Sequence, residues 1–343
     1  MSQVFDTKLL YEDYNTGQLA LSYYRPVADI FGANKGSPPN LVADSMAALG
    51  EFVGMAVFIF LALSGVQAAL EAQTGLPSDR GFTPDQIQSI AFSFGASVTV
   101  ALFICGPISG GVLNPAILLS LVLTGNINWL RGILFFVAEM VGAILGAYFC
   151  NFVTAHELQG VNLLSPGFNY AQGFFAEVLL TCTLCLTVLF VIVDKSSLSD
   201  FAPFVVGTSI FICHLIGAPI DGTSVNPARS FAASLVAGKW ANHWIFWFGP
   251  LIGSVFAVMI YLTCKILEAQ SRSQILVQQA DQMDVLDDKE ANKKSGEAFN
   301  RNLRNEYGDQ TYRNEDNTQN DTNYNSRDTD MYHSNSNTNP TST

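Results

Sequence analysis

The sequence predicts an all-α membrane protein with six transmembrane helices and two re-entrant half-helices, arranged as an inverted repeat. Three observations predict this fold: apolar stretches long enough to cross a bilayer, an uneven charge distribution, and a short motif that occurs twice. The predicted spans cover residues 45–70, 87–105, 129–151, 170–193, 201–219 and 243–266. Each is close to the roughly 20 apolar residues that a spanning helix needs.

The charge distribution divides the chain into three parts. The 343 residues are 13% charged, with a net charge of −12, whereas soluble proteins are about 25% charged. Residues 45–269 hold 17 charged side chains in 225 positions, and residues 270–343 hold 21 in 74. We expect a cytoplasmic N-terminal segment (1–44), a membrane domain (45–269) and a largely disordered polar tail (270–343), with one short amphipathic helix over 272–290. An apolar body without a basic face excludes a soluble enzyme and an electrostatic nucleic-acid binder.

One apolar stretch is too long for a single span. Residues 86–130 include no Asp, Glu, Lys or Arg, and Gly106–Gly111 is rich in helix breakers. The stretch predicts a full span, a turn at membrane depth and a half-length helix that starts near Asn114. The later uncharged stretch ends in the same way at Asp221–Ala228. Because irregular backbone inside a bilayer must be buried in protein or line a watery cavity, the two breaks predict a pore or binding site.

The membrane domain is internally duplicated, with repeats over about 45–151 and 170–266. Each repeat has three spans, so the two insert with opposite topology, which places a functional site near the bilayer midplane. The matched features are an acid in the first span, an Asn-Pro-Ala motif, and two glycines four residues apart in the last span. They are Glu51, Asn114, Pro115, Ala116, Gly142 and Gly146 in the first repeat, and Glu177, Asn226, Pro227, Ala228, Gly249 and Gly253 in the second.

The duplicated motif suits a helix that starts inside the membrane. Asn is a favoured N-cap, and Pro is favoured at the first helical position. Two such starts meeting tip to tip would bring two positive helix ends and two amide donors to the pore centre. We interpret Glu51 and Glu177 as structural buried acids that accept from backbone N–H groups of the re-entrant loops; a proton relay is the alternative. Glu139 has no counterpart in the second repeat.

Lys and Arg near the spans predict the orientation. Seven lie on the side of the N-terminus and two on the other side, which favours cytoplasmic termini. An even number of spans agrees with this orientation. We expect the plasma membrane, with an intracellular vesicle or vacuole membrane as the alternative.

Three segments carry a resemblance to a known family: Ile108–Ala116, Ser224–Phe231 and Asn242–Trp247. On these motifs the chain resembles the major intrinsic protein family, and within it the water-selective aquaporin-like subgroup. The resemblance covers about residues 45–266 and neither tail. It implies an hourglass fold, a homotetramer with one pore per subunit, and a passive channel that conducts water down osmotic gradients while excluding ions and protons. It implies no enzymatic activity, no cofactor and no metal.

The resemblance also implies a selectivity filter, carried over by spacing from each motif Asn. Its residues are Phe94, His214, Thr223 and Arg229. The aromatic ring with His and Arg favours water, since the glycerol-conducting members have a small residue in place of that His. We expect Arg229 to face water and loop carbonyls and, with the half-helix dipoles, to repel cations. The chain departs from the family pattern at Val112, where the family usually has His, and at Leu118; the missing His removes a titratable group from the cytoplasmic vestibule.

Regulation is expected at the cytoplasmic face. Candidate regulatory residues are Ser196, Ser197 and Ser199, in the loop over 194–200, and Tyr23 and Tyr24, in a segment that could plug the pore. Kinases and other cytoplasmic partners would act on this loop and on the tail. The six cysteines fall in or at the ends of spans, so we interpret them as buried apolar residues and not as disulfides or metal ligands.

Two other functions stay open at this point. One is a facilitator of glycerol or another small neutral solute. The other is a membrane scaffold with a closed pore and a partner-binding tail. An intramembrane enzyme is disfavoured, because the sequence has no Gly-x-Ser-x-Gly motif, no Ser/His dyad and no paired intramembrane aspartates.

Overall fold

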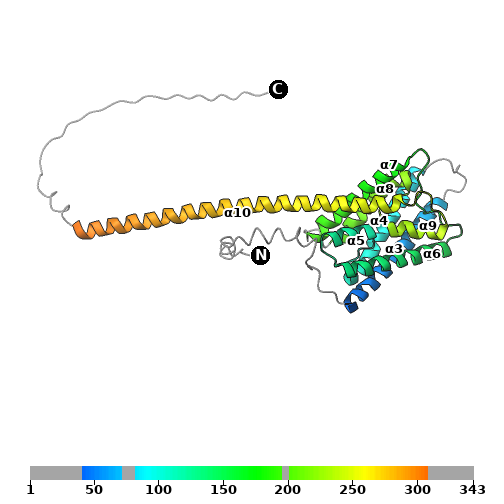
Figure 1. Cartoon of the computed structure of the whole chain (residues 1–343), viewed down its shortest axis with the longest axis horizontal. Coiled ribbons are helices and arrows are strands. Elements are labelled where there is room, and N and C mark those ends of the chain that lie inside the picture. Colours follow the sequence, from blue (N-terminus) through cyan, green and yellow to red (C-terminus); the bar gives the residue numbers. More distant parts are fainter. Residues whose placement is uncertain (1–40, 72–81, 195–200, 308–343) are drawn as a thin grey trace, which may run out of the picture. The chain divides into compact units, whose positions relative to one another are not determined.

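A computed structural model describes residues 41–71, 82–194 and 201–307, and all described secondary structure is helical. By Cα proximity the chain divides into one compact unit over Met1–Leu276 and a second over Val277–Thr343. Figure 1 shows the helices of the first unit gathered in one bundle. In chain order the elements are α3 (Leu41–Glu71), α4 (Pro84–Ser109), α5 (Pro115–Leu123), α6 (Trp129–Val153), α7 (Tyr170–Val188), η1 (Leu189–Val193), α8 (Ala202–Asp221), α9 (Pro227–Ala237) and α10 (Ile245–Tyr307).

The predicted fold class is confirmed. Within the described residues, six helices are long and apolar enough to cross a membrane, counting α7 and η1 as one, and α5 and α9 are the two half-length helices. The order of a long helix, a second long helix, a half-helix and a third long helix occurs twice along the chain. Many large apolar side chains on the outside of the bundle are exposed, including Phe92, Phe152 and Leu179. Such a surface suits contact with lipid.

Asn caps start both half-helices. The side chain of Asn114 accepts a hydrogen bond from the N–H of Ala116, and Pro115 occupies the first turn. Asn226 caps α9 in the same way, with Pro227 after it. The predicted starts of both half-helices are confirmed. The helices start there because the N-cap amide satisfies a backbone N–H that a helix start otherwise leaves unpaired.

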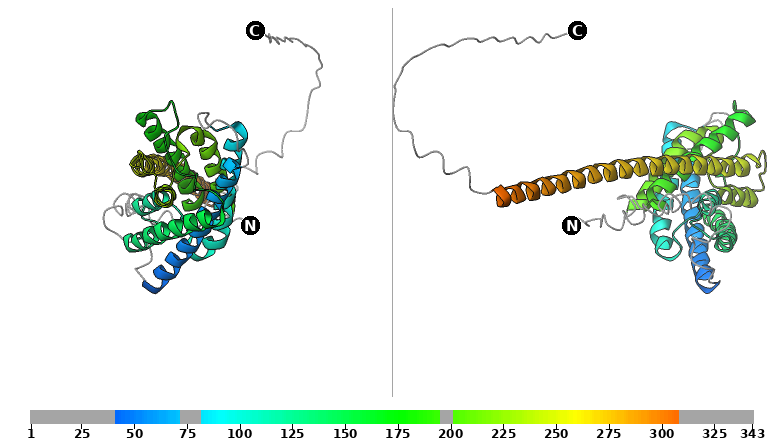
Figure 2. Two further views of the ribbon diagram at one scale, coloured as in Figure 1. Left: turned by 90° about the vertical axis from the view of Figure 1, so that its right-hand side faces the viewer. Right: turned by 60° about the vertical axis from the view of Figure 1, so that its left-hand side comes forward.

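The glycine pairs lie where two helices pack closely, and α3 and α6 lie side by side in Figures 1 and 2. A Cβ on Gly146 would lie 2.5 Å from the carbonyl oxygen of Ala56, and a Cβ on Gly253 would lie 2.4 Å from that of Val178. Real Cβ atoms essentially never come this close to backbone oxygen. The crossings α3–α6 and α7–α10 therefore require glycine, as small-residue helix contacts in membranes generally do.

The helix that follows the last span is longer than the sequence predicted. A short helix over 272–290 was expected, with disorder from about residue 299, but α10 continues to Tyr307. The reason is local composition: from residue 254 to 307 the chain has no Pro and a single Gly, Gly296, and is rich in Gln, Glu, Lys and Ala, which favour helix. The tail beyond Tyr307 and the N-terminal segment lie outside the described residues.

The close crossing of α7 and α10 yields a test on stability. We expect Gly253→Ala to destabilise the protein by about 1–3 kcal/mol, because the added methyl group forces the two backbones apart. Gly106→Ala is the matched control, since a Cβ at Gly106 meets nothing within 4 Å. Thermal unfolding in detergent, followed by tryptophan fluorescence, measures both variants. Equal melting temperatures for the two variants would contradict the crossing.

Candidate functional site

The two half-helices are joined at their N-termini by a reciprocal pair of hydrogen bonds. Nδ2 of Asn114 donates to the carbonyl of Val225 at 2.8 Å, and Nδ2 of Asn226 donates to the carbonyl of Leu113 at 2.8 Å. Each amide oxygen accepts from its own helix, so each amide keeps one N–H that these bonds do not use. Both asparagines line a cavity inside the bundle. The site therefore presents two helix N-termini and two amide donors at one point.

Two buried glutamates hold the loops that lead into the half-helices. The carboxylate of Glu51 accepts from the N–H groups of Val112 (3.0 Å) and Leu113 (2.7 Å). The carboxylate of Glu177 accepts from those of Ser224 (2.6 Å) and Val225 (2.7 Å). Each acid thus satisfies two consecutive buried backbone donors.

The backbone that these acids hold is strained. Leu113 has φ +50° and Val225 has φ +45°, a left-handed conformation that is unfavourable for residues with a branched side chain. The strain persists because carboxylates and the reciprocal asparagine bonds fix both loops. The two carboxylates therefore act as loop anchors, with all four oxygens used.

Glu139 has a related task that has no parallel in the second repeat. Its Oε1 accepts from the N–H of Asn114 at 3.1 Å, and its Oε2 has no partner among the described residues. Glu139 lies three residues before Gly142, and the residue three before Gly249 is the buried Phe246. In the second repeat the N–H of Asn226 donates instead to the hydroxyl of Ser224 at 3.4 Å. A local hydroxyl thus replaces the third acid.

Three of the four predicted filter residues meet at one end of the cavity, from α4, α8 and α9. The rings of Phe94 and His214 stack with centroids 3.9 Å apart and an interplanar angle of 18°. The guanidinium carbon of Arg229 lies 4.8 Å from the centroid of the Phe94 ring. All three side chains are almost fully buried and line the cavity.

Thr223 is not among the described residues that line the cavity. It lies in the loop between α8 and α9, and its hydroxyl packs against Gly217 of α8. The hydroxyl oxygen is buried without a partner in the described part of the chain. The structure therefore brings together three of the four predicted filter residues and places Thr223 against α8, outside the described cavity lining.

His214 presents an acceptor and Arg229 a donor at this end. Nδ1 of His214 lies 2.8 Å from the carbonyl of Ile210; a carbonyl only accepts, so Nδ1 carries the proton and Nε2 of the neutral ring is an acceptor. The guanidinium of Arg229 donates to the carbonyls of Gly160 (2.9 Å) and Gly222 (3.3 Å) and to the side chain of Asn162. Loop oxygens thus hold the charge of Arg229 in place.

Asn162 and Asp221 are site residues that sequence reasoning missed. Asn162 is buried, and its Oδ1 accepts from both Arg229 and the hydroxyl of Ser230 (2.7 Å). The one available signal was a polar residue in the connection between α6 and α7. Asp221 begins the second break in the sequence, but no sequence pattern indicates its role.

The rest of the cavity is mostly apolar. From the filter end it runs past Asn114 and Asn226 to residues of α5, α7, η1 and α8. Val112 lines it, at the position where the family pattern has His. Leu118 is buried but is not among the described lining residues. The apolar lining at the end opposite the filter includes Ile117, Leu121, Val188 and Ile192.

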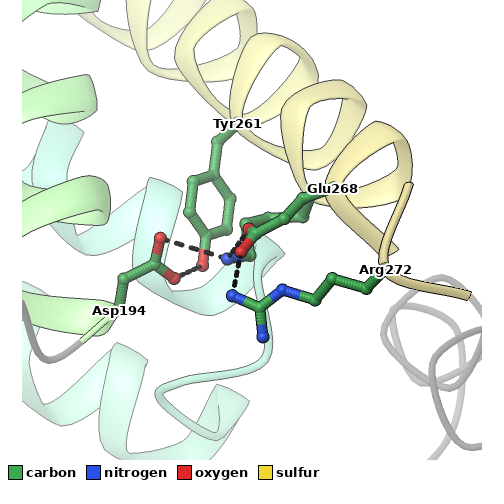
Figure 3. Close-up of polar contacts among 5 residues, drawn as sticks. Asp194, Tyr261, Glu268 and Arg272 are labelled. Carbon is green, nitrogen blue, oxygen red and sulfur yellow. Dashed lines mark hydrogen bonds and ion pairs between the residues drawn. The ribbon is translucent and has the colours of Figure 1, made fainter. Parts of the chain in front are cut away.

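A polar cluster links the end of η1 to α10 (Figure 3). The carboxylate of Asp194 accepts from the hydroxyl of Tyr261 at 2.7 Å and from Nζ of Lys265 at 3.4 Å. Lys265 also pairs with Glu268 at 2.6 Å, and Glu268 pairs with Arg272. Partly exposed ion pairs contribute little stability, so the Tyr261 bond is the firmest link.

The candidate regulatory residues Ser196, Ser197, Ser199, Tyr23 and Tyr24 lie outside the described residues.

Comparisons with known proteins identify the family. The family model described as Major intrinsic protein matches residues 41–261. The chain belongs to the major intrinsic protein family. It is 40% identical over 225 residues to Aquaporin-1 of Gibberella zeae, covering 65% of this chain and 70% of that protein. It is 37% identical over 238 residues to Aquaporin-2 of Botryotinia fuckeliana, covering 68% of this chain and 63% of that protein.

A solved structure supports the fold of this major intrinsic protein. The aquaglyceroporin from Plasmodium falciparum is similar with a TM-score of 0.54 and 24% identity, over 64% of this chain and 95% of that chain. Aquaporins of the family are channels, so the protein is an integral multi-pass membrane channel and not an enzyme.

The different use of the buried acids yields a test. Glu51→Gln replaces one of two engaged carboxylate oxygens by an amide donor, which leaves a loop N–H without an acceptor. We expect a loss of about 1–3 kcal/mol of stability. Glu139→Gln is the matched control, since its Oε2 has no partner among the described residues and the amide can take that place. Thermal unfolding in detergent compares them, and a loss for Glu139→Gln as large as that for Glu51→Gln would contradict the anchoring account.

Proposed function

We propose that the protein is a passive water channel that conducts water down osmotic gradients and excludes ions and protons. The cluster of Phe94, His214 and Arg229 at one end of the cavity carries this proposal. Two stacked rings beside a guanidinium leave little width, and the polar atoms suit a molecule that both donates and accepts hydrogen bonds. Channel selectivity of this type follows from pore diameter and from the donors and acceptors that line it.

The centre of the cavity supports the exclusion of ions. A water molecule that passes Asn114 and Asn226 meets amide donors and two positive helix ends. The oxygen of a water molecule at this point would accept hydrogen bonds from the amides of Asn114 and Asn226. It could then not also accept from the neighbouring water molecules, and this opposes proton transfer along a continuous water chain. The fixed charge of Arg229 adds an electrostatic barrier to cations.

The assembly and membrane proposed here follow from family membership and charge pattern. We infer a homotetramer with one pore per subunit, cytoplasmic termini and a location in the plasma membrane, with a role in osmoregulation. The filter would then face the outside, and the apolar end at Leu121, Val188 and Ile192 would face the cytoplasm. No observation favours glycerol conduction or a closed scaffold over water conduction, so both serve as alternative outcomes of the transport test.

Gating is proposed at the apolar end. Ile192 of η1 lines the cavity two residues before Asp194, which is bonded to α10. A π-helical segment at such a place is typical of functional sites. Phosphate added to Ser196, Ser197 or Ser199 would add charge within five residues of Asp194 in the sequence. Replacing all three by Asp should change water permeability relative to the triple Ala variant, and equal permeabilities would contradict gating by this loop.

The transport test uses proteoliposomes that contain the full chain. Wild-type vesicles should shrink in a sucrose gradient much faster than empty liposomes and should take up glycerol slowly. His214→Ala removes one of the two stacked rings, and we expect glycerol uptake to rise roughly ten-fold.

The matched control for His214→Ala is His156→Ala, because His156 is exposed and is not among the described lining residues. Fast glycerol uptake by the wild type would favour the facilitator. A wild type no more permeable than lipid, with and without residues 1–40 and the tail, would favour the scaffold.

A further inference from the structure

Asp221 is a buried acid next to the filter that the channel account above does not use. It is the last residue of α8, and only 1% of its surface is exposed. It is not among the described residues that line the cavity. Any effect on conduction must therefore act through other residues.

The side chain of Asp221 fixes the loop after α8. Its Oδ1 accepts from the N–H of Thr223 at 3.0 Å, a carboxylate bond to the backbone two residues on that stabilises a tight turn. Gly222 has φ +80° and Thr223 has φ +54°. A β-branched residue strongly disfavours that region, so the carboxylate bond compensates for strain at the point where the chain reverses.

The backbone of Asp221 fixes the opposite loop. Its carbonyl accepts from the N–H of Leu163 at 3.1 Å and from Nδ2 of Asn162 at 3.2 Å. The other end of the Asn162 amide accepts from Arg229. The carbonyl of Gly222, next in the chain, also accepts from Arg229, at 3.3 Å. Asp221 thus fixes the positions of two oxygens that bind the guanidinium, Oδ1 of Asn162 and the carbonyl oxygen of Gly222.

We propose that Asp221 is a positioning residue of the filter. Its carboxylate holds the turn whose Gly222 carbonyl binds Arg229, and its backbone carbonyl holds Asn162, which also binds Arg229. Asp221 thereby sets where the Arg229 guanidinium lies. It thereby determines how strictly the filter rejects solutes larger than water. This inference rests on the proposed channel function.

Only one carboxylate oxygen of Asp221 holds the Gly222–Thr223 turn. Oδ1 accepts from the N–H of Thr223, whereas Oδ2 does not contact this turn and lies near Gly173 of α7. The nearby charged groups are Glu177 and Arg229. Asn at this position keeps the acceptor and removes the carboxylate, so it separates the role of the acceptor from that of the charge.

The experiment measures water and glycerol permeability in proteoliposomes of the full chain, for wild type, Asp221→Ala and Asp221→Asn. For Asp221→Ala we expect the ratio of glycerol to water permeability to rise about five-fold, the effect of one lost hydrogen bond. Asp221→Asn should keep the wild-type ratio. A purely structural role would lower both permeabilities together and leave the ratio unchanged. An unchanged ratio in Asp221→Ala, or an equal rise in Asp221→Asn, would overturn the inference.

A second variant keeps the test decisive if Asp221→Ala does not fold. Asn162→Ala cuts the link to Arg229 with Asp221 intact and should raise the ratio in the same direction; no rise would overturn the inference. A wild type that conducts neither solute would overturn the proposed function instead. The inference would then be judged from electron cryomicroscopy of wild type and Asp221→Ala in nanodiscs, where an Arg229 still bonded to Gly222 and Asn162 would overturn it.

Discussion

Backbone N–H groups that lie inside a membrane need protein acceptors, and this constraint shapes the whole site. The two loops before α5 and α9 lie where lipid and bulk water offer no partners. Glu51, Glu139 and Glu177 supply carboxylate oxygens to them, and Asn114 and Asn226 tie the loops to each other. Each interaction is costly to remove, because the group that loses its partner stays buried.

The filter depends on the same anchored loops. Arg229 lies three residues after Asn226, and its backbone N–H is capped by that residue. Its side chain is held by the carbonyls of Gly160 and Gly222, so a buried charge is kept at a fixed place, with no ion pair to an acid among the described residues that line the cavity. Asp221 extends this network to the turn after α8. Conduction and stability therefore depend on the same hydrogen bonds, those that anchor the loops.

Much of this architecture could be predicted from the sequence because membrane insertion leaves strong local signals. The length of the apolar stretches predicted the spans, and the Asn-Pro pairs predicted the starts of α5 and α9. The duplicated acids predicted the residues that anchor the loops. The tasks of Asn162 and Asp221 could not be predicted, since they depend on two loops about 60 residues apart in the chain that meet only after folding. The full length of α10 could not be predicted from polarity alone, because a polar composition is typical of disordered segments, whereas the residues of this segment also favour helix.

We propose that the anchored half-helices form one path for water and none for protons. Stopped-flow shrinkage of wild-type proteoliposomes, recorded with a pH-sensitive dye inside the same vesicles, tests it most directly. The account predicts water permeability far above that of empty liposomes, with proton leakage equal to theirs. Water permeability no higher than that of lipid, or fast water flow accompanied by proton flow, would contradict it.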